Sequence, residues 1–292
     1  MLEFDDITTN GPGASSADAH NSDGFARAKK PLRWPDEHDQ KVLRDRAISE
    51  QLWGKSYYTA FDDSEIASLG KFKKNVGRAL VITGHRPNGE TFYQMRPHGG
   101  EHRYLFPKGA GGALHVSPLT KEHLDDPNIP LLVNESIPKT DSAAGSWPDA
   151  EVCSIGFGGA FGFRGINAKS GKTVSDDLQS ELIAWRGRDA AGNEFPRQVW
   201  ILFDSDVQRN PNVLAAVRRV AAFMRSKGAA VHIVALPQPT DSNIKAIAID
   251  DWRAANPSAT FADLCALELK EDSTTPPTTT RYKRQRSKSD FL

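Results

Sequence analysis

Residues 199–206 read Val-Trp-Ile-Leu-Phe-Asp-Ser-Asp, a continuous apolar run that ends in two acidic residues. An apolar run of this length is typical of a strand that is buried on both faces, as in a parallel sheet. Ligands of open α/β sheets bind beyond the carboxyl ends of such strands, so Asp204 and Asp206 are expected at a binding edge. The same Asp-x-Asp pattern also suits a turn or a helix cap, and both interpretations stay open at this point.

The sequence on either side of this run alternates between strand-like and helical patterns. Apolar runs predict strands at 129–133, 152–157 and 231–236. Helices are expected in the polar segment 139–146, at 178–185, and at 213–224, where apolar residues repeat at helical spacing. The resulting order is β-α-β, an insertion rich in Gly, Lys and Asp, and then α-β-α-β. Such alternation predicts an α/β fold whose sheet is mostly parallel and flanked by helices.

Changes in composition divide the 292 residues into four segments. Residues 1–36 are polar and rich in Gly, Ser and Asp, which predicts a disordered leader. Residues 37–118 hold a helical stretch at 37–52 and a hairpin signal at Asn88-Gly89, which predicts a small α+β subdomain. Residues 119–270 form the α/β domain, and residues 271–292 form a Pro/Thr linker with a basic tail.

Composition excludes several classes of protein. The 37 basic and 37 acidic residues cancel to a net charge of +0, so no global field attracts the chain to nucleic acid or membrane. Cys153 and Cys265 are the only cysteines, too few for a disulfide framework, which favours a reducing, cytoplasmic location. No apolar run approaches the roughly 20 residues that a membrane helix needs, so we expect no membrane partner.

A third acid is expected at the same sheet edge as the Asp-x-Asp pair. Glu135 directly follows the strand-like run Leu131-Leu132-Val133-Asn134, and parallel strands place their carboxyl ends together. Three unpaired carboxylates repel one another, and a bound divalent cation offsets that repulsion. Oxygen ligands of this kind suit Mg²⁺ or Mn²⁺. The alternative is that Glu135 is a solvent-exposed loop residue.

Four short motifs follow one another in an order that carries a resemblance. They are Leu132–Glu135 with Lys139, then Ile155–Gly159, then Trp200–Asp206, and finally Lys245 with Ile249–Trp252. This order resembles the Toprim catalytic domain of bacterial primases, topoisomerases and related nucleases. It resembles more closely the Toprim-like domain of unknown function in primase and replication proteins of phages, plasmids and other mobile elements. The segment from Gly84 to Pro118 is similar to the region that often precedes that domain.

The resemblance implies a reaction and a set of site residues. Asp204 and Asp206 would hold Mg²⁺ or Mn²⁺, and Glu135 would be a further ligand or a general acid/base. The implied activity is metal-dependent phosphoryl transfer on DNA or RNA, primase-like or nuclease-like, in the DNA replication of a mobile element. Asp250 and Asp251 are further candidate metal ligands, although a role at the start of a helix before Trp252 suits this pair better.

An alternative of a different class is a catalytically inactive Toprim-like module that binds nucleic acid or recruits a replication partner such as a helicase or polymerase. Two departures from the family pattern favour it. Toprim proteins commonly have Gly after the Glu, where this chain has Ser136, and many have Gly shortly after the Asp-x-Asp, where residues 207–210 are Val-Gln-Arg-Asn. The sequence also contains no helicase motif and no recognisable primase zinc site.

Basic residues give candidate nucleic-acid contacts. Arg96, Arg103 and Lys108 lie with aromatic residues in a glycine-rich segment, which suits phosphate pairing with base stacking. Lys139 and Lys245 are candidates for phosphate contact within the resembling region. A basic hairpin surface and solvated lysines are the alternatives for these residues.

Three tempting site patterns fail on inspection. A zinc site at His98 and His102 is disfavoured because Gly99-Gly100 interrupts the helix that would align them. Gly171-Lys172-Thr173 ends like a P-loop, but Ile166 stands where its first glycine belongs. The glycine-rich stretch after residue 155 has Phe161 in place of the third glycine of a dinucleotide site.

Overall fold

The computed structural model describes residues 34–269, apart from 73–75, 100–103, 109–112, 148–151, 159–164, 167–172, 175–178 and 242. The chain from Arg33 onward forms one compact unit. The expected leader, except for residues 34–36, and the expected linker and basic tail lie outside the described residues. No helix in the described ranges is both long enough and apolar enough to cross a membrane.

The first part of the unit is a small antiparallel sheet with short helices. Its elements are α1 (Glu37–Asp45), η1 (Glu50–Leu52), β1 (Tyr57–Ala60), α2 (Asp63–Ala67), β2 (Ala79–His85) and β3 (Thr91–Pro97). The strands are ordered β1-β2-β3 and all pair antiparallel. The expected hairpin is confirmed, because the Gly89 amide donates to the Arg86 carbonyl (2.9 Å) and Gly89 has a φ of 90°. The helix expected over 37–52 ends at Asp45, before Ala47 adopts a φ of 52°.

The second part begins with a short strand and contains a β-α-β unit. Its elements as far as the insertion are β4 (Leu114–Val116), η2 (Lys121–His123), β5 (Leu131–Asn134), α3 (Ile137–Ser146) and β6 (Cys153–Phe157). The two-residue strands β7 (Gly165–Ile166) and β8 (Thr173–Val174) pair within the insertion. The chain then runs through η4 (Ser180–Leu182), β9 (Arg186–Arg188), β10 (Glu194–Pro196), β11 (Gln198–Leu202) and η5 (Ser205–Gln208). It continues with α4 (Pro211–Ser226), β12 (Ala230–Val234), α5 (Ile249–Ala255) and α6 (Phe261–Cys265).

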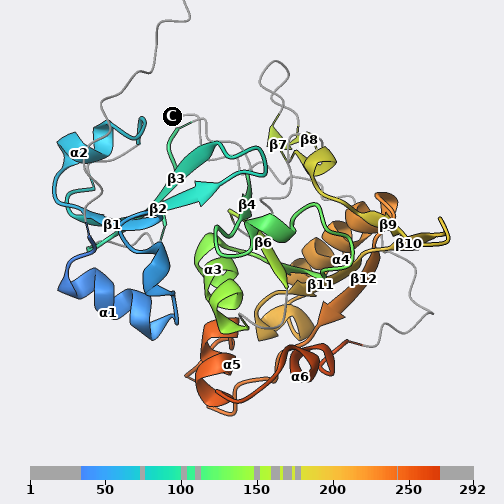
Figure 1. The fold of residues 1–292 in the computed structure, drawn as a ribbon. Helices are drawn as coiled ribbons and strands as arrows, with labels where there is room; N and C mark the ends of the chain where they lie inside the picture. Colours follow the sequence, from blue (N-terminus) through green and yellow to red (C-terminus); the bar gives the residue numbers. More distant parts are fainter. Residues whose placement is uncertain are drawn as a thin grey trace, which may run out of the picture. The chain divides into compact units, whose positions relative to one another are not determined.

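The predicted α/β sheet is confirmed. Its five strands are ordered β12-β11-β5-β6-β4, and every pair is parallel except β4 with β6 (Figure 1). Strand β4 lies before the expected boundary between residues 118 and 119, yet it pairs with the sheet of the second part. The division into two domains stays a prediction. The hydrogen bonds between β4 and β6 connect residues on either side of the predicted boundary.

Both faces of the sheet are covered, which explains the continuous apolar runs. Leu131 and Val133 of β5 pack in a cluster with α4, whereas Leu132 between them packs in a cluster with α3, α5 and α6. Successive residues of a strand point to opposite faces, so a strand covered on both sides needs apolar residues throughout. Gly156 of β6 allows α3 to pack closely, since a Cβ there would lie 1.9 Å from the Thr140 Oγ1.

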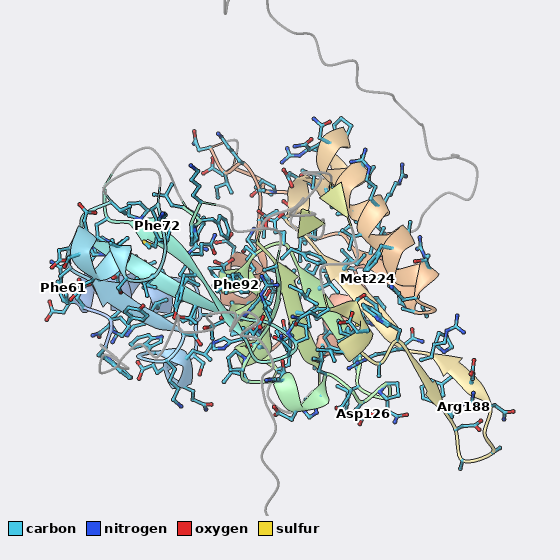
Figure 2. The ribbon with its side chains drawn as sticks, turned by 90° about the horizontal axis from the view of Figure 1, so that it is seen from above. Phe61, Phe72, Phe92, Asp126, Arg188 and Met224 are labelled. Atoms are coloured by element: carbon cyan, nitrogen blue, oxygen red, sulfur yellow. The ribbon has the colours of Figure 1, made fainter. Side chains whose placement is uncertain are left out.

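The helix predicted over 178–185 is wrong for the residues that the structure describes. That stretch contains only the short 3-10 helix η4, and Ile183 adopts extended backbone. Ile183 and Trp185 are buried while Ala184 and Arg186 are less buried, an alternation with a period of two that suits extended chain. Extended backbone then leads into the β9–β10 hairpin, whose tip near Arg188 projects away from the main body (Figure 2).

A buried polar network joins the two parts. The Tyr57 hydroxyl on β1 donates to Asp141 Oδ2 on α3 (2.7 Å), and the His115 ring on β4 bonds Asp141 Oδ1 (3.1 Å). The backbone amide of His85 donates to His115 Nδ1 (3.0 Å), so the proton of the neutral His115 ring is on Nε2 and points to Asp141. The same helix that carries Asp141 also carries Lys139.

Candidate active site

The register of the parallel strands places the expected acids at one edge. Asn134 at the end of β5 pairs with Leu202 at the end of β11. Glu135 follows the first strand directly, and Asp204 follows the second strand after Phe203. Phe203 is buried in the core, which fixes where the chain leaves the sheet. The two carboxylates therefore emerge side by side at the carboxyl edge.

Lys139 connects these two acids. Its ammonium, in the first turn of α3, donates to Glu135 Oε1 and to Asp204 Oδ1. The three side chains are only 13%, 18% and 24% exposed for Lys139, Glu135 and Asp204 respectively. Glu135 is thus not the solvent-exposed loop residue of the alternative interpretation, and Lys139 is not a solvated lysine.

Burial and charge set the titration of the cluster. Burial raises the pKa of Glu135, and the neighbouring Asp204 adds to the rise, although Lys139 opposes both. Burial alone would lower the pKa of Lys139, but the two carboxylates outweigh it and raise that pKa. The pKa of Asp206 is also raised, first by burial and then by Asp204. The ammonium of Lys139 is therefore charged at neutral pH and partly compensates the carboxylates.

The Asp-x-Asp segment forms a 3-10 turn that is anchored through its middle residue. Ser205 is buried, its amide donates to the Ile247 carbonyl (2.9 Å), and its hydroxyl accepts from the Ile247 amide (2.8 Å). Asp204 stands at the N-cap of η5, yet its side chain makes no capping hydrogen bond within the described chain. Its carboxylate bonds Lys139 instead, so the helix-cap interpretation does not account for Asp204.

Asp206 is held apart from the other two acids. In the part of the chain that the structure describes, Glu135, Asp204 and Asp206 do not form a group whose donor atoms all lie within 4.8 Å of one another. The expected convergence therefore joins Glu135 and Asp204 through Lys139 and leaves Asp206 nearby. The turn of η5 is the reason, because it replaces the extended strand ending that would have aligned Asp204 with Asp206.

The two acids of α5 have different environments. Asp251 accepts a hydrogen bond from the Ala248 amide (3.0 Å), the helix-start role that its position predicts. Asp250 is buried, lies 3.6 Å from Arg46, and has a raised pKa because of burial, against which Arg46 and Lys139 act. Its Oδ1 is buried with no hydrogen-bond partner among the described residues. Asp250 is thus a fourth carboxylate close enough to interact electrostatically with Lys139.

A pocket of about 670 Å³ is lined by Asp206 and not by Glu135 or Asp204. Two acidic residues, Asp206 and Asp241, and two basic residues, Arg209 and Lys245, contribute to its lining together with Asn210. The guanidinium of Arg209 also donates to the Lys245 carbonyl (3.1 Å), and this hydrogen bond links the two segments that line the pocket. Two cations beside carboxylates suit a phosphate-bearing ligand that is held near a metal. The sequence reasoning included Lys245 but missed Arg209 and Asn210, and their positions three and four residues after Asp206 are the signal that could have found them.

The basic residues of the first part lie apart from this pocket. Arg96 is half-buried on β3, and Lys108 is exposed with its amide bonded to the Lys71 carbonyl (2.6 Å). Within the described residues neither side chain has a hydrogen bond or ion pair with the acid cluster. Arg103 and His102 lie outside the described residues. Nucleic-acid contact by Arg96, Arg103 and Lys108 stays a prediction.

Comparison with known proteins gives a family match and a likeness to solved structures. The model of a domain of unknown function, DUF3854, matches residues 121–256, which include Glu135, Lys139, Asp204 and Asp206. No curated protein matches the chain. A crystal structure of the Aquifex aeolicus primase, comprising its zinc-binding and RNA polymerase domains, is similar with 14% identity and a TM-score of 0.47. The match covers 76% of this chain and 53% of the primase chain, so this chain spans about half of that chain's length.

Proposed function

We propose that this chain carries out metal-dependent phosphoryl transfer on nucleic acid, primase-like or nuclease-like, in the DNA replication of a mobile element. The observation that carries the proposal is the pair Glu135 and Asp204 at the carboxyl edge of the parallel sheet, with Asp206 lining a pocket that also holds Arg209 and Lys245. The sequence resemblance to Toprim-like domains supports the same reaction class.

The side chains present are of the chemical type that binds a divalent cation. Four carboxylates supply oxygen donors, and Asp250 Oδ1 is buried without a hydrogen-bond partner in the described chain. The pKa values of Glu135 and Asp206 are raised, first by burial and then by the neighbouring Asp204, so a cation bound beside these carboxylates would favour their charged forms. Asp204 and Asp206 would hold Mg²⁺ or Mn²⁺, with Glu135 as a further ligand. The metal would neutralise charge that develops on the transferred phosphate.

The chain's own residues have distinct roles in this proposal. Glu135, whose pKa is raised by burial, is suited to accept and return a proton at its carboxylate. Lys139 holds Asp204 in place before substrate binds, and it is close enough to pair with a phosphate oxygen once it leaves that carboxylate. Arg209 and Lys245 bind substrate phosphates on the pocket side.

The decisive experiment is a denaturing gel of end-labelled single-stranded DNA incubated with the full chain, ribonucleotides, and Mg²⁺ or Mn²⁺. Glu135→Gln is run beside the wild type, with Glu122→Gln as the control because Glu122 is an exposed glutamate of η2. Longer products that vanish only in Glu135→Gln support a primase, and shorter ones support a nuclease. Label that is unchanged in all three lanes contradicts the enzyme proposal.

A second candidate is the catalytically inactive module that binds nucleic acid or recruits a helicase or polymerase. The observation that favours it is the ion pairing of Lys139 with both Glu135 and Asp204, which lets the cluster serve as a structural contact without metal. Such a module keeps its affinity for single-stranded DNA when Glu135 is changed to Gln. Fluorescence anisotropy on wild type and Glu135→Gln, with and without Mg²⁺, measures this directly.

A further inference from the structure

A second cluster of metal-ligating side chains lies in the first part of the chain, where α1 meets the end of β3. His38 and Asp39 come from α1, and His98 directly follows β3. Each residue offers one donor atom, and these atoms all lie within 4.8 Å of one another. The Nε2 of His98 is 2.9 Å from Asp39 Oδ1, and the rings of His38 and His98 have centroids 4.5 Å apart.

The local structure fixes two of these three residues. The Asp36 carboxylate caps α1 by accepting from the Asp39 amide (2.8 Å), which sets the start of the helix. Asp39 consequently points inward and is 1% exposed, whereas His38 beside it is exposed. The His98 amide donates to the Arg78 carbonyl (3.0 Å), so His98 is held where β3 ends.

The surroundings of Asp39 leave one carboxylate oxygen for a ligand. Its Oδ2 accepts from the hydroxyl of the buried Thr59 (2.5 Å), and Thr59 in turn accepts from the Asp36 amide (2.9 Å). Arg78 pairs with the Asp36 carboxylate and so neutralises the acid that caps α1. Oδ1 of Asp39 is then directed toward His98. Supporting hydrogen bonds of this kind orient the carboxylate ligands of metal sites.

We propose that His38, Asp39 and His98 bind one transition-metal ion of the Zn²⁺ class. Two imidazoles with one carboxylate are the donors that Zn²⁺ accepts, whereas Mg²⁺ prefers a site made of oxygens alone. Zn²⁺ bonds of roughly 2.0–2.1 Å in a tetrahedral site separate ligand atoms by about 3.4 Å. His98 and Asp39 need only a small shift to reach this spacing, and the exposed His38 is free of core packing and can rotate to complete it.

The ion takes the place of the hydrogen bond between His98 and Asp39. Its bonds to the three side chains hold α1 against the end of β3. Three protein ligands leave the fourth position to water. This site is independent of the proposed phosphoryl-transfer site, because it uses different residues and a different class of metal. The competing explanation is a simple hydrogen bond between His98 and Asp39 with no metal.

The test is a titration of the tag-free, full-length chain, freed of metal with EDTA, with Zn²⁺ in an isothermal calorimeter. We expect saturation at one ion per chain, insensitive to excess Mg²⁺. His38→Ala and His98→Ala should each weaken binding by at least about tenfold, since even outer-sphere changes cost roughly 10–100-fold. His123→Ala is the matched control, because His123 is a partly exposed histidine of η2 that lies in the other part of the chain.

Two further measurements separate a metal site from a structural contact. His38→Ala should melt like the wild type in EDTA, because His38 is exposed, but it should lose the rise in Tm that Zn²⁺ causes in the wild type. Thr59→Val should weaken Zn²⁺ binding by roughly 10–100-fold. Equal Zn²⁺ affinity in the wild type, His38→Ala and His98→Ala, or no saturable binding by the wild type, overturns the proposal.

Discussion

The ammonium of Lys139 donates a hydrogen bond to Asp204, a residue 65 positions further along the chain. Lys139 lies in the first turn of α3, and Asp204 follows β11, so this contact links a crossover helix to the neighbouring strand's end. The same ammonium bonds Glu135. A single lysine thus occupies the place between two carboxylates where a cation is expected.

Lys139→Met tests whether the lysine competes with a metal. Removing the ammonium leaves two partly buried carboxylates unpaired, so the free energy of unfolding without metal should fall by about 1–3 kcal/mol. Added Mg²⁺ should restore part of the lost free energy of unfolding. Mg²⁺ should also bind the variant more tightly than it binds the wild type. Thermal melts with and without Mg²⁺ measure both effects.

The matched control for that variant is Lys41→Met. Lys41 pairs with Asp45 at the same four-residue spacing as Glu135 and Lys139, but both side chains are exposed. Its loss should change the free energy of unfolding by less than about 0.5 kcal/mol. A Lys139→Met variant that binds Mg²⁺ no better than Lys41→Met would show that Lys139 does not compete with metal.

Lys245→Ala tests the pocket beside Asp206 as a phosphate site. Losing one phosphate contact should weaken single-stranded DNA binding and lower the dependence of log affinity on log salt by about 0.7. Fluorescence anisotropy at several salt concentrations measures the slope. The exposed Lys41 again supplies the comparison, and identical slopes for Lys245→Ala, Lys41→Ala and wild type would exclude the pocket as a phosphate site.

Tyr57→Phe tests the network that joins the two parts. The variant removes the donor to Asp141 Oδ2 and leaves the buried carboxylate with the His115 ring alone. We expect a loss of about 1–3 kcal/mol in the free energy of unfolding by urea. Tyr93→Phe, at a half-buried position of β3, should lower the free energy of unfolding by less. An equal loss in both variants would contradict a special role for the Tyr57 hydroxyl.

His85 should make stability depend on pH. Burial, with the neighbouring His115 in second place, lowers the pKa of His85 from its ordinary value of 6.5 to about 4. The unfolded chain therefore binds a proton in this range that the folded chain does not, so stability is lost as pH falls from 6.5 toward 4. The slope contributed is at most about 1.4 kcal/mol per pH unit.

The His85→Gln variant should flatten that slope, as urea unfolding between these two pH values would reveal. Gln keeps a polar group near the Ser56 hydroxyl, which lies 2.9 Å from His85 Nε2. His123→Gln is the control and should keep the wild-type slope, because His123 is a partly exposed histidine of η2. Parallel curves for wild type and His85→Gln would assign the acid sensitivity to other groups.

Arg197 is a structural anchor that sequence reasoning missed. Its side chain is 0% exposed, and its guanidinium donates to the backbone carbonyls of Ile129, Leu124, His123 and Ala184. Arg197→Met should lower the free energy of unfolding by about 3 kcal/mol or more, because buried carbonyls lose their donors. The free energy of unfolding of Arg197→Lys should lie between those of the wild type and Arg197→Met. Arg219→Met, on the exposed face of α4, should leave the free energy of unfolding nearly unchanged. Chemical unfolding of the three variants ranks them.

The sheet could be predicted from short stretches of sequence, because an apolar run indicates a buried strand and a turn is encoded by a few adjacent residues. Continuous apolar runs identified β5 and β11, and Asn88-Gly89 identified the hairpin between β2 and β3. The same logic placed Glu135 and Asp204 at one edge, since parallel strands have aligned carboxyl ends. It failed at 178–185, where apolar residues spaced by two belong to extended chain.

The sequence by itself therefore determined the α/β class of the fold and which strand ends carry the acids. Only the tertiary structure decided that Lys139 lies between Glu135 and Asp204, that Asp206 in η5 stands outside this pair, and that His38 and Asp39 meet His98. Two of these contacts join distant residues, Lys139 with Asp204 at a separation of 65 and Asp39 with His98 at a separation of 59. They depend on how helices dock on sheets, and no short-range periodicity encodes that docking.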